Sequence, residues 1–520
     1  MLEEKKGERT LSKRKHSGNS ILRAAFVGIS LLFQAGWLLL LLIKLNEHSA
    51  WISLLTGILS LLVALHLYSK HTTSAMKMPW VMLILVFPVM GLSLYLLIII
   101  FGDLGSTGKR LKTVRAKQAA FLNQDPGVSE RLAGEDAGIG NQFRYVQTYS
   151  GAPVYENTHV TYYPQAAAAF EALKEALEQA ESFIFMEYFI LSDTSSFREI
   201  REILERKAKA GVEVRLMYDD VGSVGYVNLY FAKQLNEAGI RCRVFNPAVP
   251  VLNLFLNHRD HRKITVVDGK VGFTGGYNLS DEYFGRAFPY GRWKDTGIRL
   301  EGEAVKSLAA AFLEMWNINT RSDEDIRPYL NICHRAAAEG FVQPYTDNPL
   351  GPERVAENVY LNLINSAKKS LYMMTPYLII TDELSAALGL AAKRGVDVRI
   401  ITPGIPDKKT VYGVTRSYYG GLAGQGVRIY EWTPGFLHAK QCLCDGIIAS
   451  IGTSNLDYRS LYLHFENNVL LYGCDAVRQM GKDFQQMFHE CREVTESYRT
   501  GRGRMLRTWE CILRLFAPMM

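Results

Sequence analysis

One set of polar residues occurs twice in the chain with the same spacing. The first copy is His261-Arg262-Lys263, then Asp268, then Gly275-Gly276-Tyr277-Asn278. The second copy is His438-Ala439-Lys440, then Asp445, then Gly452-Thr453-Ser454-Asn455. Both follow one frame: His, one residue, Lys, four residues, Asp, six residues, Gly, a small residue, any residue, Asn. A lone His-x-Lys pair is commonly a surface pair, but repetition of the whole frame predicts one active site built from two halves.

These residue types suit chemistry on a phosphate group. Residues 263–267 are rich in β-branched side chains and predict a strand, so alternation places His261 and Lys263 on one face. The small residues allow close backbone approach, and the asparagine adds a neutral donor. Two facing sets would surround one tetrahedral anion with two imidazoles, two ammonium groups and two amides. The sequence therefore predicts a phosphate site that needs no metal and no cofactor. Asp268 and Asp445 count among the catalytic motif residues, but alternation places Asp268 on the face opposite His261, which favours a structural role for the two acids.

The repeated residues resemble the phospholipase D superfamily, in which each lobe supplies one His-Lys-Asp motif. Other segments are similar to the bacterial cardiolipin synthases. They are Asn257-His258-Arg259-Asp260-His261, Gly285, Trp293-Lys294-Asp295-Thr296, residues 452–460, Phe465-Glu466 and residues 513–518. The similarity extends over nearly the whole chain. Two positions depart from the family pattern: Gly297 stands where a histidine is expected, and His464 stands where asparagine is more usual.

The resemblance implies a role for each site residue. One imidazole attacks phosphorus to form a phosphohistidine, and the other gives a proton to the leaving oxygen and takes one from the incoming hydroxyl. Family precedent favours His261 as the nucleophile and His438 as the acid–base, whereas spacing alone leaves both open. The residues expected to hold the non-bridging oxygens are Lys263, Lys440, Asn278 and Asn455. Asp295, 34 residues after His261, and Glu466, 28 residues after His438, are expected to orient those imidazoles.

The repeat extends beyond the motifs. Residues 208–216 parallel residues 392–400, and each is a helix end with a glycine stop that leads into an apolar strand. This alternation predicts an α/β fold with helices on both faces of a sheet. We expect two phospholipase D-like lobes, 145–335 and 336–500, related by a pseudo-twofold axis with both motifs at the seam. The first lobe has extra apolar residues at 248–257, which would either admit lipid tails or pack as an ordinary loop.

Apolar segments precede the two lobes. Residues 24–43, 51–68 and 79–101 contain no Asp, Glu, Lys or Arg, and they predict an α-helical transmembrane region at 24–101. A basic N-terminus, 1–23, precedes them and a basic linker, 102–144, follows. Basic residues on both flanks favour a cytoplasmic position for each, which requires one segment not to cross. The expected location is the bacterial cell membrane as a multi-pass protein, with the lobes on the cytoplasmic side favoured.

Two smaller features each allow two interpretations. The seven cysteines are scattered, which favours free thiols over disulfides. Cys442 and Cys444 suggest a zinc site beside His438, but strand alternation and the lack of a second ligand pair favour packing in a sheet. The basic amphipathic tail, 501–520, would either lie on an anionic leaflet or pack on the second lobe.

Charge and hydropathy separate the candidate functions. The first is a cardiolipin synthase, which transfers a phosphatidyl group between two phosphatidylglycerol molecules and releases glycerol. The second is a hydrolytic phospholipase D or a phosphatidylserine synthase, and the third is a nuclease, suggested by a net charge of +7 and a pI of about 8.8. The apolar segments argue against the nuclease because they hold the site at a lipid surface, and basic charge suits an anionic lipid. The expected partners are phosphatidylglycerol and membrane lipids, with no nucleic acid.

Overall fold

The computed structural model describes residues 50–70, 72–101, 104–247, 257–319 and 324–500, with single positions between 25 and 40 and between 513 and 519. The chain forms two compact units. One comprises Met1–Thr107 with Asn246–His258, and the other comprises Gly108–Phe245 with Arg259–Met520. Both copies of the repeated frame lie in the second unit. The expected segment 24–43 and the insertion 248–257 fall almost wholly outside the described residues, as does most of the tail 501–520.

Three apolar helices form the described part of the first unit: α2 (Ala50–Ser69), α3 (Ser74–Val86) and α4 (Pro88–Phe101). They pack around Leu67, Ile84, Leu92 and Tyr95. The segment 51–68 is thus a helix, as expected.

The interpretation of 79–101 as one continuous helix is wrong. Pro88 forces the preceding Phe87 out of the helical region, at φ −127° and ψ 74°, so α3 ends there and α4 begins. Gly91 then allows close packing, because a Cβ at this position would lie 2.5 Å from the Cα of Ile84. Within the described part of the chain, no helix is both long enough and apolar enough to cross a membrane.

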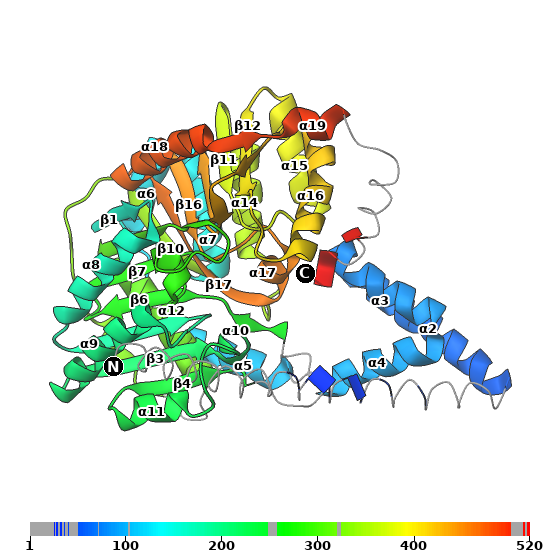
Figure 1. Ribbon diagram of the computed structural model, residues 1–520, viewed down its shortest axis with the longest axis horizontal. Helices are drawn as coiled ribbons and strands as arrows, with labels where there is room; N and C mark the ends of the chain where they lie inside the picture. Colours follow the sequence, from blue (N-terminus) through cyan, green and yellow to red (C-terminus); the bar gives the residue numbers. More distant parts are fainter. Residues whose placement is uncertain are drawn as a thin grey trace, which may run out of the picture. The chain divides into compact units, whose positions relative to one another are not determined.

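The first sheet of the second unit has the strand order β1-β9-β7-β6-β2-β3-β4. Figure 1 labels five of these strands, β1, β7, β6, β3 and β4. Its strands are β1 (Thr158–Tyr163), β2 (Phe183–Tyr188), β3 (Glu213–Asp219), β4 (Arg241–Phe245), β6 (Lys263–Val267), β7 (Val271–Gly275) and β9 (Gly297–Gly302). Pairs β2–β3 and β3–β4 are parallel, and the other pairs are antiparallel. The sheet is therefore mixed.

The second sheet repeats this order with equivalent strands, as β10-β17-β16-β15-β11-β12-β13, and adds β18 at its edge. Its strands are β10 (Phe341–Asp347), β11 (Ser370–Met374), β12 (Asp397–Pro403), β13 (Arg428–Trp432), β15 (Gln441–Cys444), β16 (Ile448–Gly452), β17 (His464–Tyr472) and β18 (Cys491–Glu493). Among these eight strands, the consecutive pairs β11–β12 and β12–β13 are parallel and the other pairs are antiparallel. The duplication inferred from the motifs thus extends to the whole sheet.

Helices cover both faces of the first sheet because side chains alternate along β2. Met186 and its alternate neighbours join an apolar cluster with α8 (Ala166–Glu178) and α9 (Ser195–Lys209). Phe185 points the other way and stacks on Phe312 of α12 (Val305–Ile318), with ring centroids 4.6 Å apart. The predicted α/β fold with helices on both faces of a sheet is confirmed for this lobe.

Further helices connect the strands. In the first lobe they are α10 (Asp220–Ser223), α11 (Phe231–Glu237), η2 (Asp281–Phe284) and α13 (Arg327–Leu330). In the second lobe they are α14 (Val355–Ser366), α15 (Asp382–Lys393), α16 (Lys409–Gly424), α17 (Tyr458–Tyr462) and α18 (Asp475–Glu490). After the last strand come α19 (Thr495–Thr500) and, in the tail, η3 (Ala517–Met519). Arg514, a described residue of the tail, lies 4.3 Å over the ring of Tyr418 in α16. This contact favours packing of the tail on the second lobe.

Most of the described residues of 102–144, expected as a basic linker, are helical. They form α5 (Leu104–Ala119), α6 (Pro126–Glu135) and most of α7 (Ala137–Ser150). Arg115 makes a 2.5 Å ion pair with Glu314 of α12, and Gln118 donates to the Ala310 carbonyl at 2.8 Å. Because apolar positions of these helices are buried, including Val114 and Phe143, residues 108–144 pack within the second unit.

The described cysteines are free thiols. They are Cys242, Cys333, Cys442, Cys444, Cys474 and Cys491, whereas Cys511 lies outside the described residues. Cys442 and Cys444 are buried on β15, and the thiol of Cys444 donates to the Leu363 carbonyl of α14 at 3.5 Å. These contacts agree with the packing role expected for the pair.

Candidate active site

Two short strand pairs join the lobes at the repeated motifs. Strand β5 (Arg259–Asp260) of the first lobe pairs with β17 of the second, and β14 (Gly435–Leu437) of the second pairs with β8 (Arg292–Lys294) of the first. The two motif histidines directly follow β5 and β14. The backbone N–H of His261 donates to the Phe465 carbonyl at 2.9 Å, and that of His438 donates to the Lys294 carbonyl at 2.7 Å. Each histidine is therefore anchored to the opposite lobe.

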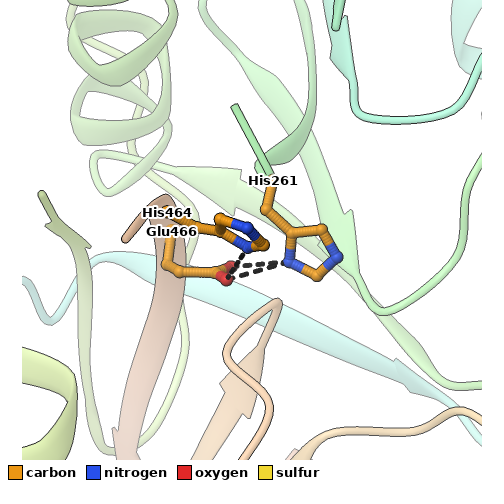
Figure 2. A group of neighbouring side chains, drawn as sticks. All are labelled: His261, His464 and Glu466. Atoms are coloured by element: carbon orange, nitrogen blue, oxygen red, sulfur yellow. Dashed lines mark hydrogen bonds and ion pairs between the residues drawn. The ribbon is translucent and has the colours of Figure 1, made fainter. Parts of the chain in front are cut away.

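The imidazole of His261 binds a carboxylate of the second lobe (Figure 2). Its Nδ1 lies 2.9 and 3.0 Å from the two carboxylate oxygens of Glu466, which is fully buried on β17. The hydroxyls of Thr453 and Ser460 also donate to this carboxylate. The ring of His464 lies 5.4 Å from that of His261. This arrangement fixes the His261 ring and leaves its Nε2 for another partner.

The imidazole of His438 binds a carboxylate of the first lobe. Its Nδ1 lies 2.6 Å from Asp295 Oδ2 and 2.7 Å from Lys440 Nζ. The close approach depends on Gly276, because a Cβ there would lie 2.1 Å from Asp295 Oδ1. The equivalent position in the second copy is Thr453, whose hydroxyl serves Glu466 instead. The two halves thus share one frame but differ at this position, where one has a glycine and the other a hydrogen-bonding threonine.

The expected pairing of carboxylates with histidines within each lobe is wrong. Asp295 contacts His438, and Glu466 contacts His261, so both pairs cross between lobes. The reason is the pairing of β5 with β17 and of β14 with β8, which carries each histidine to the carboxylate strand of the other lobe. Neither half-site is complete without the other.

The buried lysines lie beside the imidazoles and have lowered pKa values. The Nζ of Lys263 donates to the His261 carbonyl at 2.6 Å, and that of Lys440 donates to the His438 carbonyl. Burial lowers the pKa of Lys263 to about 7 and that of Lys440 to about 8, although the nearby carboxylates oppose the shift. Each lysine is therefore partly deprotonated near neutral pH. A bound anion would raise both pKa values and favour the charged form.

Both imidazoles are held neutral. Burial lowers the pKa of His261, and the charge of Lys263 lowers it further. Burial likewise lowers the pKa of His438, with Lys440 as the next cause. Burial also raises the pKa of Asp295 to about 7, against the effect of Lys440. Burial likewise raises the pKa of Glu466. When the carboxyl group is ionised, each neutral histidine can donate from Nδ1 to it and present an Nε2 lone pair.

The motif aspartates bind backbone, as alternation predicted. The carboxylate of Asp268 accepts from the N–H groups of Glu181, Ser182 and Phe183, each at 2.8 Å. That of Asp445 accepts from Lys368, Lys369 and Ser370 at 2.7–2.9 Å. Each aspartate also has a φ of 52° and precedes a glycine with positive φ, which is the Asp-Gly geometry of a tight hairpin turn. They hold strand starts and turns together and do not contact the imidazoles.

Replacing Asp268 with alanine is expected to destabilise the second unit. Three backbone donors lose their acceptor, and alanine is strained at the left-handed φ, so we expect a loss of about 2–4 kcal/mol. Asp268→Asn tolerates this φ and keeps part of the hydrogen bonding, so its loss is expected to be smaller. Urea unfolding of the two variants measures the difference, and an unchanged midpoint for Asp268→Ala would contradict the structural role.

The two motif asparagines differ in their contacts. The amide of Asn278 is engaged within the first lobe, since Oδ1 accepts from the Ile190 N–H at 2.9 Å and Nδ2 donates to the Tyr283 hydroxyl at 2.8 Å. The side-chain oxygen of Asn455 has no hydrogen-bond partner among the described residues, although its backbone N–H donates to Ser460. Phosphate binding by these two residues stays a prediction.

Aromatic residues near the imidazoles were missed by sequence reasoning. Phe189 lies edge-on to His261, with ring centroids 4.9 Å apart. Around His438 lie Tyr283, Trp293 and Phe436, with centroids 5.3–5.9 Å away. Only Trp293 belongs to a segment that resembled the family, so the others had no signal in the motif spacing. Their rings pack beside the two buried histidines.

Two α/β lobes of one topology, with facing His-Lys sets and crossed carboxylates, define the class of phospholipase D-like proteins. A family described as "Cardiolipin synthase, PLD-like domain" matches residues 173–316 and 360–488, and one described as "Phospholipase D-nuclease N-terminal" matches residues 58–98. The chain belongs to the cardiolipin synthase family of PLD-like proteins.

Relatives match over most of the chain. A protein of Streptococcus mutans named "Uncharacterized protein" is 41% identical over 461 residues, covering 88% of this chain and 99% of that protein. A protein of Halalkalibacterium halodurans named "Cardiolipin synthase" is 34% identical and covers 88% of this chain and 91% of that protein. Among solved structures, the phosphatidylserine synthase of Haemophilus influenzae aligns with a TM-score of 0.54 at 14% identity, over 72% of this chain and 97% of that one, which shows a shared fold.

Proposed function

We propose that this protein is a cardiolipin synthase that transfers a phosphatidyl group from one phosphatidylglycerol to the hydroxyl of another and releases glycerol. The observation that carries the proposal is the crossed pair of imidazole–carboxylate contacts, His261 with Glu466 and His438 with Asp295. Two equivalent imidazoles beside two lysines suit a double displacement at phosphorus, and membership of the cardiolipin synthase family supports the substrate class.

The first displacement forms a covalent intermediate on His261. With Nδ1–H donated to Glu466, the Nε2 lone pair attacks phosphorus while the bond to the glycerol oxygen breaks. His438 gives a proton to that oxygen, so glycerol leaves as a neutral alcohol. The anionic diester favours protonation of His438 in the complex, which offsets the lowered pKa of the free site. Lys263 and Lys440 stabilise the charge on the non-bridging oxygens.

The second displacement returns the enzyme to its starting state. The hydroxyl of a second phosphatidylglycerol attacks phosphorus, and neutral His438 takes its proton. The P–N bond to His261 breaks, which restores the neutral imidazole and releases cardiolipin. The amides of Asn278 and Asn455 are proposed to assist at the phosphate oxygens. No proton is gained or lost overall, and the residues of the site supply every group in the cycle.

Product analysis with three substrates tests this function. The purified full chain is incubated with phosphatidylglycerol, with phosphatidylcholine and with DNA, and the products are separated by chromatography and mass spectrometry. Cardiolipin and glycerol in equal amounts are expected from phosphatidylglycerol only. Phosphatidic acid as the main product would mean that water is the acceptor, as in a hydrolytic phospholipase D, and DNA cleavage would indicate a nuclease.

The rate is expected to fall at alkaline pH. Because the pKa is about 7 for Lys263 and about 8 for Lys440, a rise in pH from 7 to 9 removes both positive charges from the free site. On the acid side, the lowered pKa of His261 keeps its lone pair free below the usual pKa near 6.5. We therefore expect kcat/KM to be high at and slightly below neutral pH and to fall as the pH rises through about 7 to 8, where the two lysines lose their charge. A flat kcat/KM profile between about pH 5 and 9 would contradict this assignment.

We further propose that the chain works on the surface of a membrane. Phosphatidylglycerol is a bilayer lipid, and helix α2 of the first unit has several exposed leucine and isoleucine side chains, among them Leu55, Ile58 and Leu62. A contiguous apolar face of this kind is stabilised by contact with acyl chains. Flotation of the full chain with phosphatidylglycerol vesicles is expected, and a Leu55→Asp/Ile58→Asp/Leu62→Asp variant is expected to float less. Equal flotation of both proteins would contradict this role of α2.

A further inference from the structure

Three potential metal ligands lie close together at the Nδ1 edge of the His261 ring. His261, His464 and Glu466 each offer a ligand atom, and these atoms all lie within 4.8 Å of one another. Figure 2 shows the three side chains directed at a common point. Glu466 Oε1 lies 2.9 Å from His261 Nδ1 and 3.8 Å from His464 Nδ1. A histidine at position 464 is also one of the departures from the family pattern noted in the sequence.

We propose that these three residues form a site for a divalent transition-metal ion such as Zn²⁺, and that the bound ion inhibits the enzyme. Two imidazoles and one carboxylate are an established zinc ligand set that leaves one coordination position open. Zinc–nitrogen and zinc–oxygen distances near 2.0–2.2 Å place tetrahedral ligand atoms roughly 3.3 Å apart. The distances from Glu466 to the two imidazoles bracket this value, so shifts of a few tenths of an ångström would complete that part of the site.

The inhibition follows from which nitrogen the metal takes, and it rests on the proposed role of His261 as nucleophile. A metal on Nδ1 replaces the hydrogen bond to Glu466 and leaves the proton of the neutral imidazole on Nε2. Nε2 then has no lone pair for attack on phosphorus. Because the metal would also hold the Glu466 carboxylate, the ring could not return to its active tautomer until the ion left.

His464 decides whether this site exists. It lies on β17 two residues before Glu466, so alternation places both side chains on one face of the strand. Its side chain is 11% exposed, which gives the cluster a route to solvent. Asparagine binds transition metals far less readily than imidazole. With asparagine at 464, only His261 and Glu466 would remain as ligands.

Metal binding and inhibition are measured on the full chain and two variants. The test variant is His464→Asn, and the control is His159→Asn, an exposed histidine on β1. Zn²⁺ is titrated into the phosphatidylglycerol assay, and Co²⁺ binding is followed by its visible absorption with no lipid present. For His464→Asn we expect at least about tenfold weaker inhibition and loss of the cobalt band. The wild type and His159→Asn are expected to respond alike and to recover activity when a chelator is added.

The outcomes separate this site from the proposed function. Equal zinc sensitivity of His464→Asn and wild type would overturn the site, as would an unchanged cobalt band. The cobalt measurement needs no turnover, so it still reports on the site if the protein does not make cardiolipin. A second variant, His464→Gln, is expected to behave like His464→Asn, which guards against misfolding of one variant. Zinc inhibition that a chelator does not reverse would also overturn the proposal.

Discussion

His261→Ala and His438→Ala are each expected to abolish turnover of phosphatidylglycerol. Loss of the nucleophile at 261 is expected to cost roughly 10⁴-fold or more in kcat, because no other group can form the covalent intermediate. Loss of the acid–base at 438 is expected to cost about 10²–10⁴-fold. Only His438→Ala is expected to retain a phosphatidyl adduct, since His261 can still attack while the second displacement lacks its base. Initial rates with labelled phosphatidylglycerol and mass spectrometry of alkali-quenched protein measure both effects.

His159→Ala serves as the matched control. His159 is exposed on β1. Its variant is expected to keep the wild-type rate, and thermal unfolding verifies that all three variants are folded. A near wild-type rate for either active-site variant would refute the shared site. An adduct found in His261→Ala but not in His438→Ala would show that His438 is the nucleophile and His261 the acid–base.

Glu466→Gln and Asp295→Asn are expected to have the next largest effects, and each should impair the histidine of the other lobe. Both variants are expected to lose about 10²–10⁴-fold in kcat with little change in KM, because they disturb a tautomer and not lipid binding. Glu466→Gln is expected to slow adduct formation through His261. Asp295→Asn is expected to let the adduct accumulate, because His438 no longer removes the proton from the acceptor.

Double-mutant cycles test the crossed pairing directly. Adding Glu466→Gln to His261→Ala is expected to cause little further loss, because the carboxylate acts through that imidazole. Adding Asp295→Asn to His438→Ala is expected to behave in the same way. Asp268→Asn, whose carboxylate binds only backbone, is expected to be catalytically milder than Asp295→Asn. The crossed assignment would be wrong if the losses in kcat were additive in these two cycles but not when His261→Ala is combined with Asp295→Asn and His438→Ala with Glu466→Gln.

Strand pairing, and not proximity in the sequence, decides which carboxylate contacts which histidine. Glu466 is 205 residues from His261 but 28 from His438, and Asp295 is 143 residues from His438 but 34 from His261. Proximity along the chain favoured the in-lobe pairs. The short strands β5 and β14 reverse that choice, since each inserts its histidine beside a strand of the opposite lobe.

In the first unit and in residues 102–144, hydropathy and charge also suggested an arrangement that differs from the structure. A run of apolar residues predicted a single helix over 79–101, yet the backbone preference of the residue before Pro88 ends α3 at Val86. Pro88 is present in the sequence, but a hydropathy pattern alone does not predict that one helix ends and another begins there. In residues 102–144, basic side chains suggested a linker. The spacing of apolar residues such as Val114 and Phe143 instead gives helices that pack within the second unit.

Local patterns in the sequence determined the repeated frame, the α/β class, the His-Lys pairs on one strand face and the structural role of Asp268. These properties depend on alternation, glycine stops and short-range turn geometry, which a few neighbouring residues specify. The tertiary structure alone decided which carboxylate serves which imidazole, which aromatic rings surround His438, and that His464 lies beside His261. Apart from the contact of Phe436 with His438, those contacts join residues of different lobes, which the pairing of β5 with β17 and of β14 with β8 brings together.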